Sequence, residues 1–184
     1  MSFAAVSSAQ VHLLKTNIIR VEVDLSKGLN AFSIVGLPDK AVEEAKDRIA
    51  AAIKNTGFRS PKQKNHKVVI SLAPADIKKE GTLFDLPMAV GYLIASKCLP
   101  ADVRNMLFIG ELSLDGAVQP VDGVLPIVRK AKQSGFGEVY VPEENAKESA
   151  LIDGIDVYGV RNLRDLSAHL AKKDILQDED RPFI

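Results

Sequence analysis

Residues 85–96, DLPMAVGYLIAS, carry a helical pattern that is apolar on nearly every side. The apolar positions include Leu86, Met88 and Leu93, and Asp85 stands where it could cap the first turn. A helix without a polar face has to be covered by other elements all round. We therefore expect this helix to be buried at the centre of the fold.

Segments with a period of two predict strands on both sides of this helix. The clearest is 17–25, in which Ile19, Val21 and Val23 share one face and charged residues the other. A turn at 26–30 and an apolar run at 31–37 predict that the second strand returns antiparallel beside the first. Residues 3–13 are a mixed run of apolar and small residues that alternates less clearly. Further strands are expected at 67–73, 107–114, 117–121, 138–142 and 156–160, with a hairpin turn at Asp115-Gly116.

Apolar residues at three-to-four spacing predict helices between the strands. The strongest begins at Pro38 and stops at Gly57, and its charged face offers Glu44 and Arg48 as an i,i+4 pair. The segment 74–85 is expected to be a loop, because it is rich in Pro, Gly and charged residues. Other helices are expected at 124–135, 144–152 and 161–173. Interleaved strands and helices predict an α/β (α+β) fold, a two-layer sandwich with a mixed sheet.

Composition excludes several classes of protein. The 24 Lys and Arg residues balance 24 Asp and Glu, which argues against a polybasic nucleic-acid arm. The single cysteine, Cys98, excludes an internal disulfide framework and a multi-cysteine zinc site. No stretch approaches the roughly 20 apolar residues that span a bilayer, and the first residues do not have the pattern of a signal peptide. We expect a cytoplasmic protein without a membrane partner.

Common cofactor and nucleophile motifs do not occur in the sequence. There is no phosphate-binding loop, no dinucleotide fingerprint and no Gly-x-Ser-x-Gly elbow. The three histidines, His12, His66 and His169, are far apart and none has a second histidine at ligand spacing. No cofactor, metal or catalytic residue is therefore expected in this chain.

Three segments are too distinctive for a generic α/β domain. They are SIVGLPDKAVEEAKDRIAAAI at 33–53, LAPADIKKEGTLFDLPMAVGYLIAS at 72–96, and the stretch at 108–146 that contains GELSLDG. Together they resemble the N-terminal domain of the magnesium-chelatase-like AAA+ proteins, the ComM/YifB group of bacteria. The resemblance covers about residues 1–170 and implies a sandwich like that of ribosomal protein S5 and the Lon protease domain.

The same segments are similar to the proteolytic domain of Lon, which uses a Ser–Lys dyad. In this sequence Leu83 stands at the serine position, and Leu125 stands at the lysine position counted from the Gly-Glu strand. Leucine offers neither a nucleophile nor a base, so the resemblance implies that the chain is not a Lon-type peptidase. Thr82, next to the serine position, could still pair with Lys130 as a divergent dyad.

Polar residues around the former dyad form a candidate interaction pocket. Each has a simpler structural interpretation as a loop charge, an ion pair, a loop hydrogen bond or a helix cap, with Asp122 placed to cap the helix at 124–135. The functional alternative is a pocket for a partner peptide, a neighbouring subunit or a nucleic-acid backbone. The candidates are Lys78, Lys79, Glu80, Thr82, Asp85, Glu111 and Asp122.

A small group of basic residues flanks His66 and is a candidate for phosphate contacts. We call Lys62, Lys64 and Lys67 the lysine cluster. No aromatic residues alternate with these lysines, so a solvated loop is the simpler interpretation.

The resemblance also implies a domain plan and partners. Residues 1–170 are the expected N-terminal domain, and 171–184 a tail or linker toward an AAA+ ATPase module that these residues lack. ATP and Mg²⁺ would belong to that module. The implied partners are the module itself and neighbouring subunits of a hexameric ring, with DNA as a further candidate because ComM-type motors imply helicase-like work on branched DNA. The favoured function is a non-catalytic domain that serves assembly or substrate guidance. A direct DNA-binding module and a divergent peptidase are the alternatives.

Overall fold

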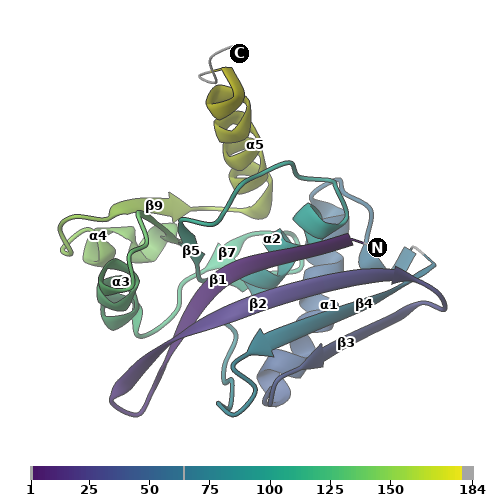
Figure 1. Ribbon diagram of the computed structural model, residues 1–184, viewed down its shortest axis with the longest axis horizontal. Helices are drawn as coiled ribbons and strands as arrows, with labels where there is room; N and C mark the ends of the chain where they lie inside the picture. The colour runs from purple at the N-terminus through teal and green to yellow at the C-terminus, as the bar shows by residue number, and fades with distance from the viewer. Residues whose placement is uncertain (1, 64, 180–184) are drawn as a thin grey trace.

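The computed structural model describes residues 2–63 and 65–179, and in this part of the chain seven strands form one mixed sheet (Figure 1). The strand order is β3-β4-β2-β1-β5-β8-β9, and β6 and β7 form a separate two-stranded ribbon. This confirms the predicted α/β sandwich with a mixed sheet. The strands are β1 (Ser2–His12), β2 (Lys15–Lys27), β3 (Ala31–Val35), β4 (His66–Ala73), β5 (Met106–Phe108), β6 (Glu111–Leu112), β7 (Val118–Gln119), β8 (Glu138–Pro142) and β9 (Asp156–Val160).

Helices cover the two faces of the sheet unequally. One face packs against α1 and α2. The other is covered by α3, which contacts β1, β2 and β8, and by α4, which contacts β8 and β9. Over β3, β4 and β2 that second face carries half-exposed polar and apolar side chains, and Figure 1 looks onto it. The helices are α1 (Lys40–Asn55), α2 (Asp85–Ala95), α3 (Val124–Gln133), α4 (Ala146–Ser149) and α5 (Leu163–Glu179), with 3₁₀ turns η1 (Pro61–Gln63) and η2 (Glu143–Asn145).

The central position predicted for the second helix is confirmed. Every residue of α2 except Ile94 is buried, between α1 and the strands β1 and β2. Gly91 lets the helix approach the sheet closely, because a Cβ there would lie 2.8 Å from a methyl carbon of Val23. None of the helices described is long and apolar enough to cross a membrane.

The predicted pairing of the first strands is wrong. The segment 31–37 does not return beside 17–25, because β4 lies between β2 and β3. Instead β1 and β2 form a long antiparallel hairpin, and β3 connects through α1 to β4, which it pairs in parallel. A helix between two paired strands is the crossover that parallel pairing requires. The expected strand 107–114 is also divided, into β5 and β6, since the backbone of Gly110 bonds to Leu83 and Leu86 instead.

Two helix starts differ from expectation. Asp39 is the N-cap of α1, with its carboxylate accepting from the Val42 amide at 2.8 Å, so Pro38 precedes the helix. Asp122 does not cap α3, whose N-cap is Gly123 at φ +75°. The end of α1 is as predicted, since Gly57 follows it at φ +98°.

The last helix is longer than its pattern predicted. α5 continues to Glu179, so the first part of the expected tail 171–184 is helical. Residues 180–184 lie outside the described residues, and the role of this tail as a linker stays a prediction.

Candidate functional site

The loop between β4 and α2 is joined to the segment that leads into α1. The Asp39 amide donates to the Lys79 carbonyl at 2.9 Å, and the Lys79 amide donates to the Leu37 carbonyl at 2.9 Å. The second carboxylate oxygen of Asp39 accepts from the Gly81 amide at 3.1 Å. One acidic residue thus caps α1 and fixes the loop that carries most of the candidate pocket residues.

Lys79 is a buried residue and not the loop charge that the sequence predicted. Its side chain is fully enclosed, and its ammonium donates to the carbonyl oxygens of Gly36, at 2.6 Å, and Pro74. Burial lowers the pKa of this ammonium. The lysine therefore ties together the ends of β3 and β4.

The start of α2 holds a buried ion pair. The guanidinium of Arg48, on α1, donates to both carboxylate oxygens of Asp85, at 2.7 and 3.0 Å. Asp85 is 1% exposed and also accepts from the Leu112 amide at 3.1 Å. Burial raises the pKa of Asp85 to about 6, against the lowering effect of Arg48. The pair joins α1, α2 and β6.

Two predictions about these side chains are wrong. Asp85 is not a helix cap, because α2 has no side-chain cap hydrogen bond and the carboxylate turns to Arg48. Arg48 does not pair with Glu44, whose carboxylate lies 3.9 Å from the Lys40 ammonium on the exposed face. The stripe of helix surface that carries Arg48 faces α2 and not solvent.

A hydroxyl and a second carboxylate complete this group. Thr82 donates its hydroxyl proton to Glu111 at 2.6 Å, and the charge of Glu111 acts on both Arg48 and Asp85. We call these four residues the Asp85 cluster. It contains three of the seven predicted pocket residues and adds Arg48, which was not a candidate.

Three other candidates stand apart from the cluster. Glu80 is exposed, and its carboxylate lies 3.6 Å from both the Lys78 ammonium and a His12 ring nitrogen. The predicted pairing of Glu80 with a neighbouring lysine is thereby confirmed for Lys78. Asp122 is exposed just before α3. Partner binding by any of the seven residues stays a prediction.

Comparison with known proteins shows the family of this chain. The family described as "Subunit ChlI of Mg-chelatase" matches residues 21–145. The chain belongs to the ChlI family. Its relatives include competence protein ComM of Haemophilus influenzae, 38% identical over 90% of this chain and 32% of that protein, and YifB of Escherichia coli, 39% identical over 86% and 31%. An uncharacterised protein of Mycobacterium tuberculosis is 41% identical over 92% and 33%.

This ChlI-family chain spans about a third of the length of those relatives. It is also similar to Lon protease 2 of Bacillus subtilis, at 35% identity over half of this chain and 17% of that protein. Both the ComM/YifB resemblance and the Lon likeness expected from the motifs are thus confirmed. Among the described residues, no group of three or more His, Cys, Asp or Glu side chains is placed to hold a metal ion.

The two former dyad positions of the ChlI-family chain hold leucines in different settings. Leu83 is partly buried and packs against both core clusters, whereas Leu125 is partly exposed on α3. The alternative base Lys130 lines a hollow beside the β1–β2 turn. The hydroxyl of Thr82 donates to Glu111, so its proton already has a carboxylate acceptor.

The lysine cluster is described in part. Lys62 lies 2.5 Å from the carboxylate of Asp47, both side chains being exposed, and this contact lowers the pKa of Asp47. Lys67 is exposed near the start of β4, and Lys64 lies outside the described residues. Phosphate binding by these lysines stays a prediction.

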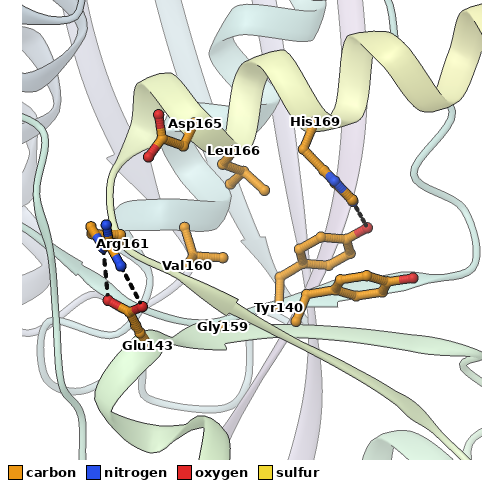
Figure 2. Close-up of a pocket in the computed structure, with 9 residues that line it drawn as sticks. Tyr140, Glu143, Gly159, Val160, Arg161, Asp165, Leu166 and His169 are labelled. Carbon is orange, nitrogen blue, oxygen red and sulfur yellow. Dashed lines mark hydrogen bonds and ion pairs between the residues drawn. The ribbon is translucent and has the colours of Figure 1, made fainter.

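Sequence reasoning missed a hollow of about 350 Å³ between β9 and α5 (Figure 2). Its wall includes Tyr140 and Tyr158, whose rings stack with centroids 4.9 Å apart, and the Glu143–Arg161 ion pair. The Tyr140 hydroxyl lies 3.2 Å from a His169 ring nitrogen on α5. No spacing rule could find this hollow, because its residues come from separate elements that only the fold brings together.

Buried polar contacts anchor α5 at this hollow. Tyr140 donates to Glu138 at 2.7 Å, which leaves its oxygen to accept from the His169 ring. Lys173 lies 2.5 Å from the Glu138 carboxylate and 4.6 Å from the centre of the Tyr158 ring. Burial, together with the Lys173 charge, lowers the pKa of His169. These contacts hold the first half of α5 against the sheet.

Proposed function

We propose that this chain is a non-catalytic domain of an AAA+ motor that acts on DNA, and that it serves ring assembly or substrate guidance. The observation that carries the proposal is Leu83 at the position where Lon-type peptidases have their serine. A leucine cannot attack a carbonyl, and the nearby hydroxyl of Thr82 is hydrogen-bonded to the carboxylate of Glu111 and not to the lysine amine of a Ser–Lys dyad.

The Asp85 cluster supports a structural role for the former catalytic region. A Ser–Lys dyad needs an amine that can accept the nucleophile's proton. Here the cation nearest to the start of α2 is the guanidinium of Arg48, which remains protonated and is held by two hydrogen bonds to Asp85. The cluster joins two helices and the β6–β7 ribbon, which supports a role in stiffening the domain.

The longer relatives supply the rest of the proposal. The chain spans about a third of their length, and one of them carries the name of a competence protein. We infer that ATP and Mg²⁺ are bound by a separate AAA+ module, and that this domain contacts that module and neighbouring subunits of a hexameric ring. DNA is the substrate of the assembled motor.

A peptidase assay tests the non-catalytic part of the proposal. We expect the wild-type chain and Thr82→Ala to leave an unfolded, fluorescently labelled polypeptide uncut, each giving the rate of a buffer blank. The Lon-like domain of a true peptidase provides the positive control. Cleavage by the wild type that Thr82→Ala abolishes would instead support the divergent peptidase.

The size of the native protein tests the motor assignment. An antibody raised against this chain should detect a band far heavier than 19.9 kDa in an extract of the source cells. That protein, once purified, should hydrolyse ATP faster when branched DNA is added. A band at 19.9 kDa would contradict the motor assignment and leave a free-standing domain.

A further inference from the structure

The turn between β1 and β2 has an unusual composition. Only Leu13 and Leu14 join the two strands, since His12 already pairs with Lys15. In this turn Leu13 lies at φ +55°, whereas Leu14 does not have positive φ. A two-residue hairpin turn of this kind prefers glycine at its first central position. A leucine rarely adopts this conformation. Residues with such local strain cluster at functional sites.

Both leucine side chains of this turn point into solvent. Leu13 is 85% exposed and Leu14 is 102% exposed. The hairpin carries them past the body of the domain, at one end of the sheet (Figure 1). Packing within the chain therefore does not explain why two large apolar residues occupy the turn.

A hollow of about 470 Å³ lies beside the turn, and we call it the turn-side hollow. The hairpin contributes Leu14, Lys15, Thr16 and Asn17 to its wall, and α3 contributes Pro126, Arg129, Lys130 and Gln133. The wall contains three cationic side chains and no carboxylate. The cations come from two segments that are far apart in the sequence, so it is the fold that gathers them.

The three cations of the turn-side hollow lie together without a counter-charge. Among the described residues, Lys15, Arg129 and Lys130 form no ion pair, as is also true of Lys27 and Lys67, but only these three line this hollow. Like charges brought together without a counter-charge repel one another. An anionic ligand would relieve that repulsion.

We propose that the β1–β2 turn and the turn-side hollow form a nucleic-acid contact, in which the three cations bind backbone phosphates and the two leucines pack against an exposed base at a strand end or junction. The inference rests on the proposed function, which makes DNA the substrate of the motor. Phosphate contacts by Lys and Arg supply affinity, and apolar side chains such as Leu are used as wedges between bases.

Charge and shape favour nucleic acid over a membrane. Segments that recognise anionic lipid usually gather about four to eight basic residues, and the turn-side hollow has three. A concave wall also suits a phosphate backbone better than it suits a flat bilayer. The proposed phosphate contact lies at the opposite end of β2 from Lys67, which pairs with Ser26.

Fluorescence anisotropy with a labelled forked DNA tests the contact. We expect the triple variant Lys15→Gln/Arg129→Gln/Lys130→Gln to bind at least about tenfold more weakly than the wild-type chain. The slope of log Kd against log salt should also fall by about 2 to 3, since each duplex phosphate contact contributes roughly 0.9. The matched control, Lys27→Gln/Lys62→Gln/Lys67→Gln, removes three charges at the other end of β2 and should bind like the wild type.

A second variant separates the leucines from the stability of the turn. Leu13→Gly/Leu14→Asn places glycine at the position with positive φ, so Tm should rise. Its affinity for forked DNA should nevertheless fall several-fold, while its affinity for a blunt duplex changes little. A role of the leucines in folding alone would give a lower Tm and unchanged binding.

Several outcomes would overturn the contact. Loss of binding in the control variant alone would return the phosphate site to the lysine cluster. Binding of the wild type to phosphatidylserine vesicles but not to DNA would make the turn a membrane contact, and a leucine-dependent dimer in light scattering would make it a contact between copies. Each of these leaves the proposed function to be decided separately, by the size and the DNA-stimulated ATPase activity of the native protein.

Discussion

Replacing Gly36 with alanine is expected to destabilise the chain severely, although the substitution adds only one methyl group. A Cβ at this position would lie 2.2 Å from the backbone carbonyl oxygen of Leu72, and Gly36 has φ +105°. Backbone cannot move aside as a flexible side chain can, so β3 and β4 would have to separate locally. The Gly36 carbonyl also accepts from the buried Lys79 ammonium, so this shift would weaken one of the two hydrogen bonds that hold that charge. We expect a loss of about 4 kcal/mol or more in the free energy of unfolding.

Gly57→Ala is the matched control for this substitution. Gly57 has a similar φ of +98°, but nothing lies within 4 Å of the position of its Cβ. Gly57→Ala should therefore lose only the free energy needed to hold an alanine at positive φ, about 1 kcal/mol, which corresponds to a fall in Tm of about 2–4 °C. Urea unfolding followed by circular dichroism compares the two variants. Equal losses of unfolding free energy in the two variants would mean that the clash of the new methyl group with Leu72 does not destabilise the chain.

Removing the Arg48 side chain should expose the cost of burying Asp85. In Arg48→Met the carboxylate of Asp85, 1% exposed in the wild type, loses both guanidinium hydrogen bonds. Breaking one partner of a buried ion pair costs about 3–5 kcal/mol, because a charge is left buried without its counter-charge. For a chain of this size that corresponds to a fall in Tm of roughly 6–20 °C. Calorimetry at neutral pH measures it directly.

The pH dependence of Tm in Arg48→Met tests whether the Asp85 carboxylate causes the loss of stability. The pKa of Asp85 is about 6 in the folded chain and 3.8 in its unperturbed state. Between these values the folded chain binds more protons than the unfolded chain, so this group lowers stability as pH rises. Without Arg48 the pKa of Asp85 rises further in the folded chain. The loss of folding stability with rising pH then extends through neutral pH. The difference in Tm between wild type and variant should therefore be small near about pH 5 and largest near about pH 8.

An exposed arginine pair provides the control for Arg48. Arg104 also makes a double contact with a carboxylate, that of Asp102, but its side chain is 90% exposed. Arg104→Met should leave Tm unchanged at every pH, because exposed ion pairs contribute little. A comparable loss in both variants would mean that burial of Asp85 is not what makes the Arg48 contact important.

Local patterns in the sequence predicted the elements far better than their pairing. Three predictions that depend only on neighbouring residues are confirmed. They are the burial of α2 on all sides, the alternation in β2 and the hairpin turn at Asp115-Gly116. The order of the first strands depends on which distant segment packs beside them. Nothing in the residues 17–37 indicates that β4 inserts between β2 and β3.

The candidate site shows the same division. The i,i+4 spacing predicts that Arg48 pairs with Glu44. The guanidinium instead contacts Asp85, which is 37 positions away in the sequence. Lys79 resembles a loop charge because sequence alone does not reveal which carbonyl groups will surround it. The turn-side hollow joins Lys15 to Arg129 and Lys130 through the packing of a hairpin on a helix. Such partners can be found only once the tertiary contacts are known.

The long final helix has a mechanical consequence. The 17 residues of α5 extend about 25 Å, while Leu163, Leu166 and Leu170, which anchor it in the core, lie in its first half. The helix projects beyond the body of the domain (Figure 1). The helix is therefore held at its first part, where it contacts the stacked tyrosines of β8 and β9, and its far end can tilt about this contact. The far end of the helix lies about 15 Å beyond His169, so a tilt of about 10° at this contact moves that end by roughly 3 Å. Force applied there reaches the sheet through Tyr140, His169 and Lys173.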